Sequence, residues 1–491
     1  MSPLEYYRVP GSVRDNVDIV YKGVDSAASE PQLHGAPHRQ RFLKIWRIVG
    51  YLLAGTLLRL VYTQLTEPPP VVPLSPPLVV SLPPPVLSRP SPARETKSNL
   101  SPPTKRFASL SEGRWVRREG PYTQADAVRD YGAEAADVRG EKTALLVTSW
   151  TWSPMLPGRV MRDWDGYDFA KRMLNSEIGL LIAGDSISSQ MMGALGSIGG
   201  APAMLSVTRY DPYEVGTAPH NPHTVVRNNM VPSTLIEIAL KRDSEWYPRL
   251  RKELPHVPES RFIEPFARGV RHDTLVDLPE LKEMVRGLGK IPQFHDEGVR
   301  FIRTQDWKRY LRPLSSTPGW PGQQKSIAIL NTGAHIAPSQ LGLDALTISK
   351  LHPLMAREIM LFVKAIPRLH TMYRSTAPGQ PRCPVFRKPV YPAPPFADHD
   401  KSKAYGWGAF GHYNEIWGRE MDRLSPTGLS DDLSGSLVFL NVTDMSLQRP
   451  DARAIKRINR PDCLHWVLPG VPSHWIRMAW HVIGELDEGR V

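Results

Sequence analysis

The sequence predicts an α/β fold: a three-layer sandwich with a mainly parallel central sheet, preceded by an N-terminal membrane anchor and a stalk. Three short apolar runs, at 178–185, 326–333 and 436–443, are bounded by turn residues. Such runs are typical of strands buried on both faces. Between them, apolar residues recur near helical spacing over 352–369. Strands that alternate with helices favour a parallel sheet that is covered by helices on both faces.

The composition is that of a globular protein with a proline-rich part added. The chain has 491 residues, of which 41% are hydrophobic and 22% charged. This length suffices for one large domain or two ordinary ones. Its 49 prolines are about twice the average usage, so part of the chain is expected to be unfolded.

The chain is basic, since Lys and Arg together exceed Asp and Glu by 12. An excess of this size suits nucleic acid, an anionic membrane face or an anionic polymer. The sequence has no zinc-finger spacing, no aromatic signature of single-strand binding and no long Lys/Arg tract. We therefore expect a basic, solvated surface and no nucleic-acid partner.

The N-terminal part predicts a type II membrane protein. Residues 1–44 are polar and lack periodicity, which indicates a disordered cytoplasmic tail. The span 45–65 is mostly apolar and just long enough to cross a bilayer. Basic residues precede this span, so the positive-inside rule places the rest of the chain in the lumen or outside. An amphipathic helix that lies on a membrane or packs in a core is the alternative.

Two further regions follow the expected anchor. Residues 66–108 include "PPPVVPLSPPLVVSLPPPVLSRPSP", and proline at this density favours an extended polyproline spacer. We expect it to be a stalk that holds a catalytic body away from the membrane. The body itself is expected to occupy residues 109–491.

The first candidate for chemistry is the run "LLIAGDS", which ends at Ser186. In open parallel sheets, function gathers at the carboxyl ends of the strands. A serine at such a turn meets backbone N–H groups and a helix dipole, both of which favour developing negative charge. The alternative is that Ser186 or Asp185 only caps the following helix.

A nucleophilic serine needs a base, and the base needs an orienting acid. The run "RPDCLHWVLPGVPSHW" supplies Asp462 and His465, three residues apart, so both side chains could lie on one face.

A transition state of acyl transfer also needs donors for its oxyanion. Asn331, Gly333 and His335 follow a predicted strand and are candidates, with an ordinary turn as the alternative.

The two cysteines, Cys383 and Cys463, are too few for a four-thiolate zinc site, and no metal is expected. Their number alone leaves two alternatives open. One is a single disulfide in an oxidising compartment, and the other is a pair of buried free thiols.

Five sequence blocks, through their order and their residues, resemble those of a known family. They are "GDS", "NTGAH", "YRSTAPGQPRC", "LNVTDMSLQRPDA" and "DCLHWVLPGVPSHW". Together they resemble the PC-esterase or trichome-birefringence-like family, a branch of the GDSL/SGNH hydrolases. The last block is the most specific, and the resemblance covers roughly residues 115–475.

The resemblance implies an SGNH-like form of the sandwich and a set of site residues. Ser186 would be the nucleophile, His465 the base and Asp462 its orienting acid. Both cysteines fall inside family blocks, which implies a Cys383–Cys463 disulfide. The residues expected to form the oxyanion hole or to contact substrate are Gly184, Asn331, Gly333, His335 and Trp466.

The resemblance also implies a function. Family members are polysaccharide O-acetyltransferases of the Golgi with type II topology and a luminal catalytic domain. We therefore expect acetyl transfer through Ser186 to a cell-wall or secreted polysaccharide, with no bound cofactor. The acetyl donor would be acetyl-CoA or a partner membrane protein. The alternatives are a polysaccharide acetyl esterase with the same triad and a non-catalytic glycan-binding protein.

Three departures from the family pattern qualify this expectation. Plant members have an arginine shortly after the nucleophile, where this chain has Ser188, Ser189 and Gln190. A histidine of the common "Ser-Pro-Gly-His" motif is replaced by Gln380. Plant domains are also rich in cysteine, whereas this chain has two.

Overall fold

The computed structural model describes residues 104, 107–155, 160–199, 203–210, 234–290, 305–377, 379–395, 406–425, 435–455 and 462–489. The expected tail (1–44), the expected anchor (45–65) and the stalk before Thr104 lie outside these residues. Within the described part, no helix is both long and apolar enough to cross a bilayer. Thr104 donates its N–H and hydroxyl to Asp422, so the end of the expected stalk contacts the folded body.

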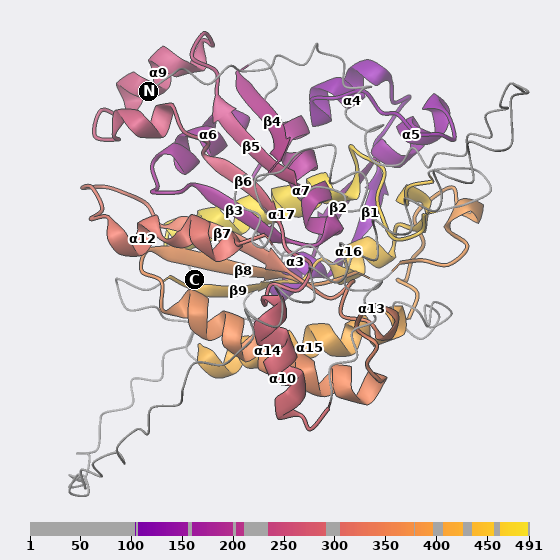
Figure 1. Ribbon diagram of the computed structural model, residues 1–491. Helices are drawn as coiled ribbons and strands as arrows, with labels where there is room; N and C mark the ends of the chain where they lie inside the picture. The colour runs from indigo at the N-terminus through magenta and orange to yellow at the C-terminus, as the bar shows by residue number, and fades with distance from the viewer. Residues whose placement is uncertain are drawn as a thin grey trace, which may run out of the picture. The chain divides into compact units, whose positions relative to one another are not determined.

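A seven-stranded sheet forms the centre of the body (Figure 1). The five strands β6, β3, β7, β8 and β9 are parallel neighbours in that order, and β5 and β4 continue the sheet beyond β6 with antiparallel pairing. The prediction of an α/β fold with a mainly parallel sheet is therefore confirmed. The strands are β3 (Leu180–Gly184), β4 (Met204–Tyr210), β5 (Thr234–Leu240), β6 (Ala267–Arg271), β7 (Ser326–Asn331), β8 (Leu369–Arg374) and β9 (Leu437–Leu440).

Helices flank both faces of this sheet, and successive strand residues point to opposite faces. In β3, Leu180 and Ile182 pack into one core while Leu181 and Ala183 pack into the other. Both faces are thus apolar, which is why the strands read as continuous apolar runs. On the first face lie α6 (Gly166–Leu174), α7 (Ser186–Ile198) and α17 (Val471–Asp487), and on the second lie α10 (Leu278–Gly287), α14 (Ala345–Lys364) and α15 (Phe410–Leu424).

Smaller elements complete the described body. The strands β1 (Gly113–Arg117) and β2 (Trp150–Pro154) form a separate antiparallel pair. The short α-helices are α3 (Ala108–Ser111), α4 (Gln124–Tyr131), α5 (Glu141–Thr148), α9 (Trp246–Glu253), α12 (Pro313–Ser316), α13 (Pro338–Leu341) and α16 (Thr443–Leu447). The 3-10 helices are η1 (Glu259–Phe262), η2 (Trp307–Leu311), η3 (Cys383–Val385), η5 (Trp407–Ala409) and η6 (Pro450–Ala452).

The helix expected over 352–369 has different ends in the structure. It is α14, and it begins after Asp344, whose carboxylate accepts from the N–H of Thr347 as an N-cap. Pro353 lies inside the helix rather than at its start. The helix ends at Lys364, shortly before Pro367, which cannot continue a helix. Leu369, the last residue of the expected helix, begins β8.

The chain order places a switch point between β3 and β7. After β3 the chain builds β4, β5 and β6 on one side of it, and then crosses over to build β7, β8 and β9 on the other side. Loops that leave the carboxyl ends of two such strands diverge and open a crevice, where ligands bind in open α/β sheets. Ser186 follows β3, and Asn331 ends β7.

Candidate active site

Ser186 lies at the first position of α7, immediately after β3. The N-cap is Asp185, whose buried carboxylate accepts from the N–H of Ile187 at 2.9 Å. The hydroxyl of Ser186 is therefore not needed to cap the helix. Gly184 precedes the turn with a φ of 155°, and a Cβ there would lie 2.3 Å from the carbonyl oxygen of Asn331. Only glycine fits this close approach of β3 and β7.

The hydroxyl of Ser186 faces His465. Its Oγ lies 2.8 Å from His465 Nε2, although 279 residues separate the two in sequence. On the other side of the ring, His465 Nδ1 lies 2.7 Å from Asp462 Oδ2. A carboxylate accepts from Nδ1–H and so leaves Nε2 unprotonated, able to take the proton of the serine. The three residues form a continuous chain of hydrogen bonds.

Asp462 also organises the backbone of its own loop. Its Oδ1 accepts from the N–H groups of Leu464 and His465, at 3.3 and 3.2 Å. The carboxylate thus fixes both the ring and the backbone that carries it. The His465 side chain is 24% exposed, so the chain of hydrogen bonds reaches the surface.

A disulfide holds the loop that carries this pair (462–466, the His loop). Cys463 is bonded to Cys383, which is the pairing that the resemblance implies. The N–H of Gln380 donates to the carbonyl of Cys463 at 2.8 Å. Closing a loop across 80 residues of sequence stabilises the fold by about 4 kcal/mol in the chain-entropy model.

Two polar side chains fix the His loop from other elements. Gln190, one turn along α7 from Ser186, accepts from the N–H of Trp466 at 3.0 Å and donates to its carbonyl at 2.9 Å. Ser186 and the loop that carries His465 are thereby tied to one another through α7. Arg453 donates to the carbonyl of Leu464 at 2.5 Å, and its guanidinium lies over the Trp466 ring at 3.5 Å. Burial lowers the pKa of Arg453, and the nearby Asp462 carboxylate opposes that shift.

Asn331 lies at the same sheet edge, but its amide is already engaged. Its Nδ2 donates to the carbonyl of Arg374 at 2.8 Å and to Thr376 Oγ1 at 2.7 Å, and its Oδ1 accepts from Arg374 at 2.6 Å. Both amide hydrogens are used in this structure, and the oxyanion role of the side chain stays a prediction. Asn331 forms a buried polar network with Arg374.

Arg374 is the cation at the centre of that network. It is fully buried in β8, donates to Ser188 Oγ at 3.3 Å and packs over the ring of Trp475. Burial lowers its pKa to about 10, and the buried Asp185 carboxylate acts in the opposite direction. The network therefore underlies the first turn of α7 without reaching Ser186.

His335 and Trp466 also differ from expectation. His335 Nε2 lies 3.4 Å from an Arg271 guanidinium nitrogen and 3.8 Å from Asp273, so it belongs to a polar cluster at the ends of β6 and β7. Trp466 is only 2% exposed and packs edge-on against Trp475. The direct substrate contact expected of Trp466 does not suit a buried core ring.

The N-terminus of α7 lies where its N–H groups can donate to an oxyanion at Ser186. The N–H groups at the first positions of a helix have no partner within it, and the helix dipole favours an anion there. Ile187 is satisfied by the Asp185 cap, which leaves the N–H of Ser186 beside its own hydroxyl. Gly333, expected in the same role, lies just beyond β7 with a φ of 149°. Its carbonyl accepts from Ile336.

The residues that position the site are not identified by the sequence motifs. In the sequence, Gln190 is distinguished only by following the place of a family arginine, and Gln380 by replacing a family histidine. Arg374 and Arg453 carry no motif of their own. A signal was available in Arg374 and Gln380, which lie in the block "YRSTAPGQPRC". Arginine at the end of a buried strand indicates a buried, hydrogen-bonded charge.

The described residues contain no group of three or more His, Cys, Asp or Glu side chains that could hold a metal ion. Comparison with protein-family models and with curated proteins finds no match to this chain. Two observations bear on function: the hydrogen-bonded geometry of Ser186, His465 and Asp462, and the resemblance of the sequence blocks.

Proposed function

We propose that the protein is an O-acetyltransferase that moves an acetyl group through an acyl-Ser186 intermediate onto a polysaccharide hydroxyl. The observation that carries this proposal is the unbroken hydrogen-bond chain from Ser186 Oγ through His465 to Asp462. The same three residues occupy the matching positions of the PC-esterase-like blocks. We further propose that the sandwich is of the SGNH-like form.

In the first half-reaction, His465 Nε2 takes the proton of Ser186 as Oγ attacks the acetyl carbonyl of the donor. The oxyanion that forms is stabilised by N–H groups at the start of α7 and by the helix dipole. Collapse of the intermediate breaks the bond to the leaving group, which takes the proton from His465. The acetyl group is then an ester on Ser186.

In the second half-reaction, a sugar hydroxyl gives its proton to His465 Nε2 and attacks the acetyl ester. Collapse releases the acetylated sugar, and His465 returns the proton to Ser186. Asp462 stabilises the imidazolium that exists between these steps. The residues thus supply a base, an orienting acid and a helix end that stabilises an anion. The acetyl donor is acetyl-CoA or a partner membrane protein.

The test compares two serines one turn apart on the same helix. Full-length protein would be incubated with acetyl-CoA and candidate glycans, and acetyl would be sought on the protein and on the glycan by mass spectrometry. Ser186→Ala should abolish both products. Ser189→Ala is the matched control, because its hydroxyl makes only a 3.5 Å bond to the carbonyl of Asp185. Unchanged glycan acetylation by Ser186→Ala would refute the proposal.

Hydrolysis is the second candidate function. His465 and Asp462 are 24% and 17% exposed, so water can approach the acyl ester as well as a sugar can. The same residues then act as an acetyl esterase, since only the acceptor differs. Release of free acetate from an acetylated glycan, with no transfer to an added acceptor, would favour this function.

We also propose a location. The expected anchor over 45–65 and the positive residues before it support a type II protein of the Golgi membrane with the catalytic body in the lumen. A tagged chain should colocalise with Golgi markers, and its C-terminal body should resist protease in sealed vesicles. Degradation of the body by protease added outside the vesicles would contradict this topology.

A further inference from the structure

A basic loop lies beside the His loop. It comprises residues 380–390, "QPRCPVFRKPV", and is called the basic loop below. It holds three cationic residues, Arg382, Arg387 and Lys388, and no acidic residue. Three prolines restrict its backbone. The basic loop is therefore positively charged and restrained. Acetyl transfer through Ser186 does not itself require such a loop.

The structure holds the basic loop at three points. Gln380 Nε2 donates to the carbonyl of Leu447 at 2.5 Å, and the N–H of Val390 donates to the carbonyl of the next residue, Gln448, at 2.8 Å. The two ends of the loop therefore meet, as in a compact Ω-loop. The Cys383–Cys463 disulfide holds its first turn. A loop fixed in this way loses little entropy when it binds a ligand.

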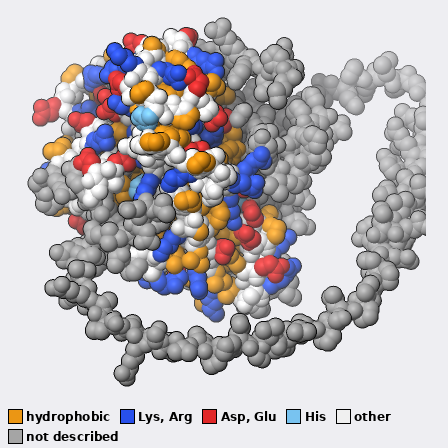
Figure 2. All heavy atoms as spheres, turned by 90° about the vertical axis from the view of Figure 1, so that its left-hand side faces the viewer, with side chains coloured by type: hydrophobic (Ala, Val, Ile, Leu, Met, Phe, Trp, Pro, Cys, Tyr) orange, Lys and Arg blue, Asp and Glu red, His pale blue; other side chains and the backbone are white. Residues whose placement is uncertain are grey.

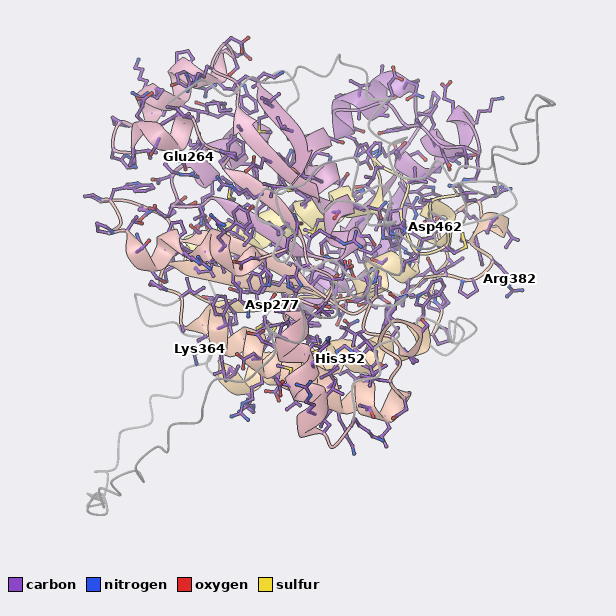
Figure 3. All side chains as sticks on the ribbon, viewed as in Figure 1. Glu264, Asp277, His352, Lys364, Arg382 and Asp462 are labelled. Atoms are coloured by element: carbon purple, nitrogen blue, oxygen red, sulfur yellow. A yellow bond between two sulfur atoms is a disulfide. The ribbon has the colours of Figure 1, made fainter. Side chains whose placement is uncertain are left out.

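The disulfide also limits the distance from the basic loop to the triad. The Cα atoms of Cys383 and Cys463 are 5.6 Å apart. Arg382 and Asp462 each adjoin one of these cysteines, and adjacent Cα atoms are about 3.8 Å apart, so the Cα atoms of Arg382 and Asp462 are within about 13 Å. Figure 3 shows both residues on the same side of the molecule. A few sugar units of a polysaccharide span that distance.

The charge of the basic loop is not neutralised locally. Arg387 donates to the carbonyls of Pro384 and Phe386 within the loop, and Arg382 and Lys388 are exposed. Among the described residues, no carboxylate lies within ion-pair distance of these three cations.

The face that carries α9 is different. There, Lys171 and Arg249 both pair with Glu253, and basic and acidic side chains are interspersed (Figure 2). The positive charge of the basic loop is therefore a local feature, distinct from the mixed charge of that face.

We propose that the basic loop binds the carboxylates of an acidic, uronic-acid-containing polysaccharide and so presents the hydroxyls of neighbouring sugar units to Ser186. This inference rests on the proposed function, and it adds a substrate class and a binding surface to it. Val385 and Tyr391, 69% and 72% exposed, supply apolar surface on or next to the loop for the faces of sugar rings. A surface that combines cations with exposed apolar groups matches a charged sugar polymer.

The test measures binding in the absence of an acetyl donor. The probes are polygalacturonate, a neutral mannan and poly-L-glutamate, which carries carboxylates but no sugar. Arg382→Gln/Lys388→Gln in the full chain should weaken polygalacturonate binding about tenfold at low salt, an effect that added salt reduces. The matched control is Lys350→Gln/Arg357→Gln, which removes the same charge from the exposed side of α14 and should bind as the wild type does.

Two results would overturn the inference. Equal weakening by the control pair would mean that only net charge matters. Equal binding of poly-L-glutamate and polygalacturonate, with equal loss in the loop variant, would mean that any polyanion fits. Because binding is measured without a donor, its failure leaves the acyl-serine proposal intact. Conversely, glycan acetylation by Ser186→Ala would refute the proposed function and leave the binding result standing.

Discussion

Two groups of polar side chains lie next to one another at the carboxyl edge of the sheet. One group is Ser186, His465 and Asp462, which is partly exposed. The other is the network of Asn331 and Arg374, which is buried and in which the Asn331 amide makes its hydrogen bonds to Arg374 and Thr376. They meet at Ser188, whose hydroxyl accepts from Arg374 and which lies two residues after Ser186.

The difference between the two groups is solvent access rather than residue type. Asparagine and arginine can both serve as catalytic donors, yet here they bond to one another and to the backbone. Ser186, His465 and Asp462 also bond to one another, but the side chains of His465 and Asp462 are 24% and 17% exposed. We therefore expect substitutions in the first group to reduce activity, and substitutions in the second to reduce the free energy of unfolding.

The largest effect should separate two histidines at this edge. His465→Ala removes the base and should lower the turnover of acetyl transfer by about 10⁴-fold or more, with little change in melting temperature. His335→Ala, in the neighbouring cluster, should lower turnover by less than about tenfold. Steady-state kinetics on both variants would measure this. Equal losses of turnover would place His335 in the catalytic machinery and would show that the two histidines do not differ in role.

Next in size is Arg374→Met. It deletes a buried cation and leaves the buried carboxylate of Asp185 without its compensating charge, so the free energy of unfolding should fall by about 3–5 kcal/mol. Chemical denaturation of the variant would measure the loss. A stability within about 0.5 kcal/mol of wild type would show that the network does not support the fold.

Asn331→Ala should act in the same direction with a smaller effect. It removes three hydrogen bonds at a buried position, for an expected loss of about 2–3 kcal/mol. Turnover per folded molecule should change less than tenfold. A fall of about 10²–10³-fold in turnover at unchanged stability would instead assign Asn331 to the oxyanion hole.

Acid should destabilise the protein through buried histidines that are separate from the site. Burial lowers the pKa of His352 and of His370 to about 3. Between pH 6.5 and 3 the unfolded chain binds protons that the folded protein does not, so stability falls as the pH drops. In that window, each histidine should lower the free energy of unfolding by about 1.4 kcal/mol for each pH unit by which the pH drops. The melting temperature of His352→Phe should therefore fall less than that of the wild type between pH 7 and pH 5. An equal fall in the two proteins would contradict this prediction.

The smallest effect is expected from Gln190, which positions the base. Gln190→Ala deletes both bonds to the backbone of Trp466, so the His loop should be less well ordered relative to Ser186. We expect turnover to fall about tenfold while the Michaelis constant stays nearly unchanged. Gln190→Glu keeps the acceptor for the Trp466 N–H and should recover part of the loss. A change confined to stability would mean that Gln190 is only structural.

The sequence predicts the fold class because buried parallel strands leave a simple pattern. The three apolar runs contain β3, β7 and β9. The helix over 352–369 was displaced because Asp344 caps it upstream and Pro353 is tolerated inside it. Propensity alone does not reveal that a proline will be accommodated in a packed helix.

The hydrogen-bonded arrangement of Ser186, His465 and Asp462 was predictable because acyl transfer demands particular residue types in a recognisable block. The hydrogen-bond partners of Asn331 were not predictable, because the same amide can bind an oxyanion or a buried arginine, and its partner Arg374 is 43 residues away. Which of the two occurs depends on tertiary contacts. The same holds for Gln190, whose partner Trp466 is 276 residues away.

The proposed mechanism requires that Ser186 becomes acetylated as an intermediate. The most direct measurement mixes the full chain with an excess of acetyl donor, quenches in acid before turnover is complete, and maps the protein by peptide mass spectrometry. We predict one acetyl group on the peptide that contains Ser186, lost when acceptor glycan is added before the quench. An unmodified Ser186 while the glycan becomes acetylated at the wild-type rate would contradict the account.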